Sequence, residues 1–447
     1  MATVTGPVTG GVHGRPFGRP LVDLDRYGYV EEEFFLEGDA TRYRLVGEMT
    51  RDGRWTAEPA ASAPLRTRVV VYRPADESQA NGTAVVSWNN VTAGYELFGG
   101  ESLEMLENGW AFVGVSAQKV GIVGLAPANQ GLRDWDPERY GTLEHPGDDY
   151  SYDIFTQAAE AIRAGDLGAL RAERLIAQGA SQSAGRLCTY INAIHPLTRA
   201  FDAYLVQIWF GSGTPLDVGD AVVNINAMPA EPETNRRLLQ GSHQLRDDLD
   251  VPVMVVNSEL EAMPCYDVRQ PDTDRFRYWE AAGTCHVSKQ SMDIRVPKYE
   301  RDFGTALPVM EKMNRIPLMP LYDAALHHID RWLRDGTAPP SQPKIEFAGP
   351  GEIVRDEHGI AKGGIRLPQA DVPVARNSAI PLGNDIFSIL YGSCEPFPVE
   401  KVRALYGDRA TYLARFEEAA CAAEKAGVLL PRDVEAAVEE ARATSPI

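Results

Sequence analysis

The feature that most constrains this fold is a strand, a forced turn and a helix in immediate succession. They occupy positions 174–196, with the sequence RLIAQGASQSAGRLCTYINAIHP. The apolar run 175–177 predicts the strand, and apolar positions at helical spacing over 184–194 predict the helix. Small residues lie two positions to either side of Ser181, which lets the two arms of a sharp turn pass each other. We therefore expect the Ser181 hydroxyl at the carboxyl end of the strand. We also expect the N–H of Gln182 to point to where an oxyanion would form.

The same stretch allows a second register, because Ser181 and Gly185 also flank Ser183 at a distance of two residues. We favour Ser181, since it follows the strand directly, whereas Ser183 would fall in the first helical turn. A pattern this short also fits a small-residue turn without any chemical role.

Composition and charge exclude several classes of protein. The 447 residues are 44% hydrophobic and 24% charged, which is typical of a globular protein. A net charge of −19 argues against nucleic acid or an anionic membrane as a partner. The N-terminus has no signal-peptide core and no apolar run approaches 18 residues, so we expect a soluble cytoplasmic protein. The five cysteines are scattered without CxxC spacing, which indicates neither a disulfide framework nor a zinc site.

Strand and helix patterns alternate along most of the chain. Polar and apolar residues alternate at 31–36, 41–46 and 67–74, which predicts that the fold begins with mostly antiparallel strands. Buried strands and helices follow them. The predicted later strands span 82–90, 110–118, 201–210, 251–258 and 277–286, and the predicted helices span 98–107, 148–165 and 321–336. This order predicts an α/β fold with a mainly parallel central sheet and helices on both faces.

Three segments fall outside that alternation. Residues 119–147 are rich in Gly, Pro and Asp and are expected to form a long loop, and residues 211–250 are expected to form an inserted lid. Residues 341–447 are expected to form a C-terminal extension that packs on a core of residues 1–340 and ends in a helical tail.

A serine nucleophile needs a base, and the base needs an acid that fixes its tautomer. In this fold the acid should follow the strand at 251–258, where Glu261 is the favoured candidate and Glu259 the alternative. The base should follow the last strand, which leads to His286. The pair His327 and His328 lies inside a predicted helix.

A second oxyanion donor should come from the loop after an early central strand. The segment SWNNVTAG at 87–94 offers the backbone N–H of Asn90 or Val91. The asparagine side chains can instead tie this loop together, and Tyr95 can line a pocket or belong to the core.

Together these motifs resemble the alpha/beta hydrolase-domain family, a group of bacterial and fungal proteins of about this length that are described as esterases. The resemblance rests on the elbow, on SWNNVTAG, HPGDDYSYDIFTQA, SELEA and AGTCH, and on the later segments DRWLRDGTAPP and GIAKGGIRLPQADVPVA. It implies Ser181 as nucleophile, Glu261 or Glu259 as acid and His286 as base. The family's elbow usually has Gly near position 183 or 184, where this chain has Ser183 and Ala184.

The leading functional hypothesis is therefore a serine hydrolase that cleaves a carboxylic ester or lactone of a small molecule, with no metal or organic cofactor. An amidase or an acyltransferase would use the same three groups. A binding protein that keeps the fold without catalysis is the hypothesis from another class, and the Ser, acid and His in the required order argue against it.

Overall fold

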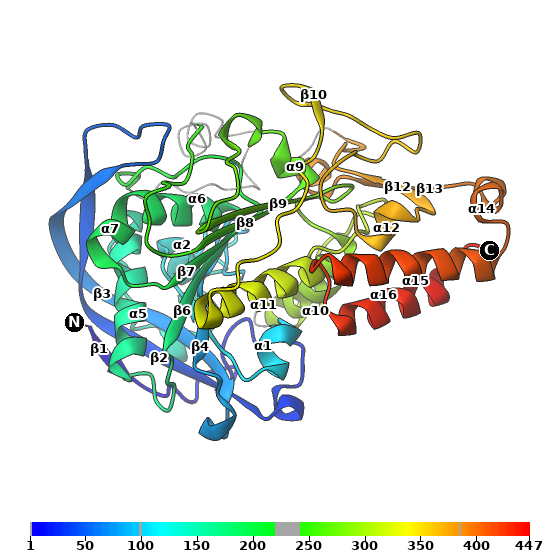
Figure 1. Ribbon diagram of the computed structural model, residues 1–447. Coiled ribbons are helices and arrows are strands. Elements are labelled where there is room, and N and C mark those ends of the chain that lie inside the picture. The colour runs from blue at the N-terminus through cyan, green and yellow to red at the C-terminus, as the bar shows by residue number, and fades with distance from the viewer. Residues whose placement is uncertain (1, 98–100, 220–241, 384–385) are drawn as a thin grey trace. The chain divides into compact units, whose positions relative to one another are not determined.

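The computed structural model describes residues 2–97, 101–219, 242–383 and 386–447 (Figure 1). Its chain divides into two compact units, Met1–Val253 and Met254–Ile447. Ser181 belongs to the first unit, and Glu261 and His286 belong to the second. Most of the lid predicted at 211–250 lies outside the described residues.

The sheet of the first unit is antiparallel on one side and parallel on the other. Strands β1, β2, β3 and β5 pair antiparallel in that order, and β5, β4, β6 and β7 then pair in parallel. Parallel neighbours need crossover connections, which the helices between these strands supply. The α/β class predicted from the sequence is confirmed. The strands are β1 (Thr3–Thr5), β2 (Tyr29–Val46), β3 (Thr56–Pro74), β4 (Thr83–Trp88), β5 (Ala111–Val115), β6 (Arg174–Ala180) and β7 (Ala203–Gln207).

One prediction about the antiparallel side is wrong. The two strands expected at 31–36 and 41–46 form the single strand β2, which pairs with β3 from Tyr29 to Val46. Gly38 and Asp39 suggested a turn, but they stay in the ladder opposite Leu65 and Pro64. The irregularity in the pairing lies between Thr41 and Tyr43.

The crossover helices of the first unit include several short ones. The long loop predicted at 119–147 contains three of them. The helix predicted at 98–107 is the shorter α1, which begins after its N-cap Ser102, and residues 98–100 lie outside the description. The helices are α1 (Leu103–Glu107), α2 (Lys119–Val123), α3 (Leu132–Trp135), α4 (Pro137–Tyr140), α5 (Ser151–Ala164), α6 (Gln182–Thr189) and α7 (His195–Thr198), with one π-helical turn at Tyr190–Ile194.

Helix α5 is fixed to the sheet by aromatic packing and by an acidic first turn. The ring of Trp88, at the end of β4, lies 4.9 Å from that of Phe155, which lies 4.8 Å from that of Phe201. The Asp153 carboxylate accepts hydrogen bonds from the Thr41 N–H at 2.8 Å and from the Tyr43 hydroxyl at 3.1 Å. The first turn of α5 thus holds the far end of β2.

A buried ionic network ties the N-terminal segment to the antiparallel strands. The Arg68 guanidinium donates to the carboxylate of Glu33, to Glu96 Oε2 at 3.0 Å and to the Phe17 carbonyl at 2.7 Å. Arg139 Nε donates to Glu33 Oε2 at 2.5 Å. Burial raises the pKa of the Glu96 carboxyl, against the opposing effect of Arg68. The segment before β2 is therefore held by charges buried within this unit.

Strand β8 (Val253–Ser258), which belongs to the second unit from Met254 on, and β9 (Phe276–Ala281) are hydrogen-bonded neighbours. The strand predicted at 277–286 ends early, because Gly283 has a φ of 73° and the chain turns there. Two small hairpins pair β10 (Phe347–Gly349) with β11 (Glu352–Ile353) and β12 (Ala375–Ser378) with β13 (Ser393–Pro396).

Helices make up much of the remaining second unit. Figure 1 shows α15 and α16 side by side, and His328 on α11 bonds the Gly427 carbonyl between them at 2.8 Å. The helix predicted at 321–336 is α11, and the predicted helical tail is α14 to α16. The helices are α9 (Glu259–Ala262), α10 (Lys289–Phe303), α11 (Met319–Asp335), α12 (Pro368–Asp371), α13 (Ile386–Tyr391), α14 (Val399–Tyr406), α15 (Arg409–Lys425) and α16 (Pro431–Thr444).

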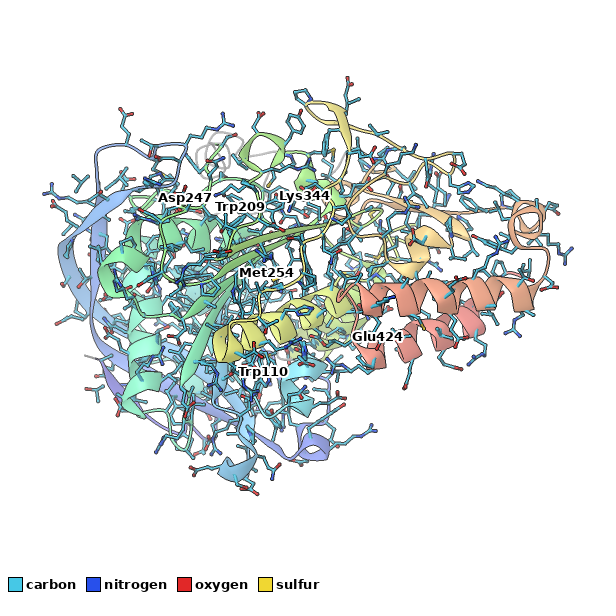
Figure 2. All side chains as sticks on the ribbon, viewed as in Figure 1. Trp110, Trp209, Asp247, Met254, Lys344 and Glu424 are labelled. Atoms are coloured by element: carbon cyan, nitrogen blue, oxygen red, sulfur yellow. The ribbon has the colours of Figure 1, made fainter. Side chains whose placement is uncertain are left out.

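Residues after 340 bond directly to β9 and its neighbours. Lys344, labelled in Figure 2, donates to the Tyr278 carbonyl and pairs with Asp272 at 3.4 Å. The Ile365 N–H donates to the Glu280 carbonyl at 2.7 Å, and the Ile365 carbonyl accepts from the Ala282 N–H at 2.9 Å. The segment GGIRLP thus lies along the end of β9. The division into a core of 1–340 and an extension of 341–447 stays a prediction.

The glycine before Ile365 is required by a close approach. Gly364 has a φ of 65°, and a Cβ there would meet Ile345 Cγ1 at 2.7 Å and the Glu280 carbonyl oxygen at 2.9 Å. Gly351, in the turn between β10 and β11, has a φ of 75° with nothing within 4 Å of a Cβ. A side chain at either position would strain the backbone, because both have a positive φ. Only at Gly364 would it also clash with neighbouring atoms.

We predict that Gly364→Ala lowers the free energy of unfolding by more than Gly351→Ala does. Both variants bear the left-handed backbone cost of about 1–2 kcal/mol. Gly364→Ala adds an overpacking cost of about 1–3 kcal/mol. Urea denaturation of the two variants and the wild type measures the difference. Equal losses would show that the approach of Gly364 to β9 is not tight.

Candidate active site

The turn at Ser181 joins β6 to α6 through a strained backbone. Ser181 has φ 61° and ψ −118°, which an L-residue rarely adopts, and it is partly exposed. Its N–H donates to the Gln207 carbonyl at 3.0 Å, and its carbonyl accepts from the Ala184 N–H at 3.0 Å. The neighbouring strand and the first helical turn therefore hold the strained residue from both sides.

The small residues around the turn have steric reasons. A Cβ at Gly179 would lie 2.7 Å from the Ser183 carbonyl oxygen, because strand and helix cross closely there. A Cβ at Gly185 would lie 3.2 Å from Thr214 Oγ1, where a later segment packs on α6. The spacing that singled out this stretch thus reflects how closely its arms pack.

The alternative serine lies in a different environment. Ser183 is in the first turn of α6, its side chain is fully buried, and its Oγ has no hydrogen-bond partner among the described residues. Ser181 lies on the turn itself. The geometry favours Ser181 over Ser183 as the exposed hydroxyl.

The loop after β4 is tied to this turn by the side chain of Asn90. Asn90 Nδ2 donates to the Ala180 carbonyl at 2.9 Å, directly before Ser181, and Asn90 Oδ1 accepts from the Thr92 N–H at 2.9 Å. The backbone N–H of Asn90 donates to the Leu97 carbonyl at 3.0 Å. Because that hydrogen bond occupies the Asn90 N–H, Val91 is the better candidate for an oxyanion donor in this loop.

The other predicted donor is the N–H of Gln182. Gln182 is the first residue of α6, and the first N–H groups of a helix have no carbonyl partner within the helix. The helix dipole also places partial positive charge at this end. The Gln182 N–H is therefore suited to an oxygen that develops negative charge beside Ser181.

A buried cation behind the turn was missed by the sequence analysis. Arg186 on α6 donates to Asp148 Oδ2 at 3.0 Å, and Gln118 Nε2 donates to the same oxygen at 2.8 Å. The Trp88 indole donates in turn to Gln118 Oε1 at 3.1 Å. Asp148 lies in the HPGDDY run of the sequence, which was noted as a motif without a role. This network joins α6 to the segments before α2 and α5.

In the second unit, the predicted acid and base contact each other. His286 Nδ1 lies 2.7 Å from Glu261 Oε1, and both side chains are buried. Glu261 Oε2 accepts from the N–H of Ser258 at 3.1 Å and from its hydroxyl. The bond from the Ser258 N–H is one half of a capping box at the start of α9, which the S-x-x-E pattern of SELE could have revealed.

The alternative acid, Glu259, has other partners. Its Oε2 accepts from the Gly283 N–H at 2.7 Å, and its Oε1 accepts from Arg355 Nη2 at 2.7 Å. The Glu259 carboxylate is thus bonded to Gly283 and Arg355 rather than to the His286 ring. Between the two glutamates, the geometry favours Glu261 as the partner of the histidine.

The other residues that the sequence offered as candidates for chemistry are inert or belong to packing. Burial raises the pKa of the neighbouring Cys285 thiol well above its usual range, which removes it as a thiolate nucleophile. His328 bonds a backbone carbonyl, as a packing histidine does. Tyr95 is buried beside Phe17, with the two rings at 6.3 Å.

The part of the chain that the structure describes has neither a candidate metal cluster nor a candidate membrane-spanning helix. Within residues 2–97, 101–219, 242–383 and 386–447, no group of three or more His, Cys, Asp or Glu side chains could hold a metal ion. Over the same residues, no helix is both long and apolar enough to cross a membrane.

Comparison with known proteins identifies one family. The family model for an alpha/beta hydrolase domain matches residues 4–439. No curated protein matches the chain. Similar solved structures include an esterase from Pyrococcus furiosus, with 9% identity, a TM-score of 0.32 and coverage of 59% of this chain and 86% of that one. A glucuronoyl esterase from Solibacter usitatus has 10% identity, a TM-score of 0.30 and coverage of 68% and 86%. None of these likenesses is close enough to assign a substrate.

We predict that Ser181→Gly raises the free energy of unfolding by about 1 kcal/mol, because glycine adopts the backbone of Ser181 without strain. Ala184→Gly, two residues into α6, is the matched control and should lower it by about 1 kcal/mol. Urea denaturation of both variants measures the two changes. A Ser181→Gly variant that is less stable than the wild type would contradict a strained turn at this residue.

Proposed function

Because this chain belongs to the alpha/beta hydrolase domain family, whose model it matches over residues 4–439, we propose that it is a serine hydrolase of carboxylic esters. The observation that carries the proposal is the buried contact between His286 and Glu261, in a chain whose strand-to-helix turn presents Ser181. In the proposed reaction, Ser181 is the nucleophile, His286 the general base and Glu261 the residue that orients the base.

The hydrogen bond to Glu261 determines which nitrogen of His286 can act as a base. A carboxylate accepts hydrogen bonds, so its contact with Nδ1 favours the tautomer that carries its proton there. Nε2 is then the unprotonated nitrogen. In the proposed first step, Nε2 takes the proton of the Ser181 hydroxyl while Oγ attacks the ester carbonyl carbon.

The carbonyl oxygen becomes negatively charged in this step. We propose that the N–H groups of Gln182 and Val91 stabilise it. Removal of one such donor typically costs about 10²–10³-fold in kcat. The role of Asn90 is then to hold the loop through its bond to the Ala180 carbonyl rather than to donate its own N–H.

The tetrahedral intermediate collapses when the alcohol leaves with the proton from His286. Water then attacks the acyl-enzyme, gives its proton to His286 Nε2, and releases the carboxylic acid as Ser181 recovers its hydrogen. A lactone substrate would follow the same steps and release one hydroxy acid. An amide substrate, or an alcohol in place of water, would use the same groups.

We predict that wild-type protein hydrolyses p-nitrophenyl esters and that Ser181→Ala or His286→Ala lowers kcat by at least about 10³-fold, because either change removes a reacting group. Initial rates on a series from acetate to palmitate measure this. Ser183→Ala is the matched control and should keep its activity. Loss of activity in Ser183→Ala with activity retained in Ser181→Ala would contradict the assignment of the nucleophile. A wild type that neither cleaves esters nor reacts with a fluorophosphonate at Ser181 would favour the alternative hypothesis, a binding protein that keeps the fold without catalysis.

A second prediction concerns the acid. Glu261→Gln should lower kcat by about 10²–10⁴-fold, because an amide can donate to Nδ1 and favour the wrong tautomer of His286. The change keeps the shape of the side chain, and circular dichroism checks that the fold is kept. Steady-state kinetics on p-nitrophenyl acetate measure the loss. Full activity in this variant would exclude Glu261 as the acid.

A further inference from the structure

Helix α9 carries two buried carboxylates that hold the same loop at different points. Glu261 contacts the side chain of His286, whereas Glu259 contacts the backbone of Gly283, three residues earlier. Both glutamates are 0% exposed. The Glu259 N–H also donates to Thr284 Oγ1 at 3.3 Å. The first turn of α9 thus bonds to this loop at the Gly283 backbone as well as at the His286 side chain.

Glu259 receives several donors. Besides the Gly283 N–H, it accepts from Arg355 Nη2 at 2.7 Å, from the Ala379 N–H at 3.2 Å and from the Ser378 hydroxyl at 3.3 Å. A buried carboxylate is costly unless it is paired and hydrogen-bonded, and the Arg355 guanidinium supplies the opposite charge.

Arg355 is itself fixed in place. Its Nη1 donates to the Gly359 carbonyl at 3.1 Å, and Arg355 pairs with Ala361 in an isolated β-bridge. Its side chain is 21% exposed, so the cation closes the outer side of the Glu259 site. The segment that holds Arg355 lies about seventy residues beyond the loop in sequence, as the two residue numbers show.

The rest of the loop is also anchored. The Gly283 carbonyl accepts from Asn314 Nδ2 at 2.7 Å, and the Val287 N–H donates to the Leu390 carbonyl at 3.0 Å. His286 therefore lies between two residues, Gly283 and Val287, whose backbone groups are fixed by hydrogen bonds. Of these anchors, the contact of Gly283 with Glu259 is the one that depends on a buried charge.

We propose that Arg355, through Glu259, is a positioning residue that holds His286 against Glu261. This inference rests on the proposed function for its catalytic consequence. Loss of the Arg355 charge leaves the Glu259 carboxylate buried without a counterion. A buried carboxylate without a counterion moves toward water, and this movement weakens its contact with the Gly283 N–H. The loop shifts, and the base is displaced from its place beside Glu261.

The test compares Arg355→Met with Arg269→Met, a closely matched control. Arg269 pairs with the buried Glu280 at 2.6 Å, and its side chain is 18% exposed. The described contacts of the Glu280 carboxylate are to Arg269 and the Ile345 N–H, outside the loop of His286. Both variants remove a cation from a buried glutamate in the same unit, and only one touches the loop.

Two readouts are measured on the full-length protein. The first is the kcat and KM for p-nitrophenyl acetate. The second is the carbon–proton NMR spectrum of the histidine rings, in which the chain's eight histidines give few signals and His286 is assigned by its loss in His286→Gln. In Arg355→Met we expect kcat to fall by about 10-fold or more, with KM changed less than twofold, because a small displacement of a catalytic group lowers the rate steeply. The His286 ring signals should also move. Arg269→Met should change neither readout.

Two further variants test whether charge is the cause. Arg355→Lys keeps the cation and should restore part of kcat. Arg355→Met combined with Glu259→Gln removes the uncompensated charge while the amide oxygen can still accept from Gly283, so it should be more active than Arg355→Met alone. This double variant also covers the case in which Arg355→Met does not fold.

Unchanged His286 ring signals in Arg355→Met, or equal effects in Arg269→Met, would overturn the inference. A wild type without esterase activity and without fluorophosphonate labelling would contradict the proposed function instead. In that case the histidine ring signals alone still decide whether Arg355 positions His286, since they require no turnover.

Discussion

A carboxylate that is removed from water must be supplied with donors, and this constraint organises the second unit. Glu259 and Glu261 lie in one short helix and are both fully buried. Their donors come from the helix start, from the loop after β9 and from segments near residues 355 and 378. The need to satisfy two charges brings together parts of the chain that are more than a hundred residues apart.

The first unit holds Ser181, the proposed nucleophile, in another way. Ser181 is kept in an unfavourable backbone conformation by the ladder to β7 and by the first turn of α6, so rigid neighbours bear the strain. Gly179 allows the strand and the helix to approach closely enough for this turn. Packing and backbone pairing therefore fix the position of Ser181, the proposed nucleophile, whereas paired buried charges fix that of His286, the proposed base.

Local patterns predicted the elements of this fold better than the contacts between them. The strand before Ser181, the helix after it and α11 follow from apolar periodicity, which depends only on nearby residues. The break predicted within β2 was wrong, because pairing with β3 overrides the turn preference of Gly38. The short helices at 119–140 lack the length that produces a clear period.

The candidate site divides in the same manner. Chain order led to Ser181, His286 and two glutamates, since the order of the three groups follows from the topology. The contact with His286 distinguishes Glu261 from Glu259, and the cation of Glu259, Arg355, is 96 positions away and leaves no local signal. In the same way, nothing in the segment SWNNVTAG shows that Leu97 occupies the N–H of Asn90. Sequence periodicity indicates which residues are buried. The choice between the two glutamates and between the two oxyanion donors depends instead on which buried groups form hydrogen bonds with each other.

The anchors of the loop that carries His286 also order events during synthesis. A ribosome releases Ser181 and its flanking strands long before Arg355, Ala379 and Leu390, which bond Glu259 and the loop. Until those residues have been made, the chain lacks the contacts that fix the loop of His286. The last of these contacts becomes available only late in translation, when nearly nine-tenths of the 447 residues have been made.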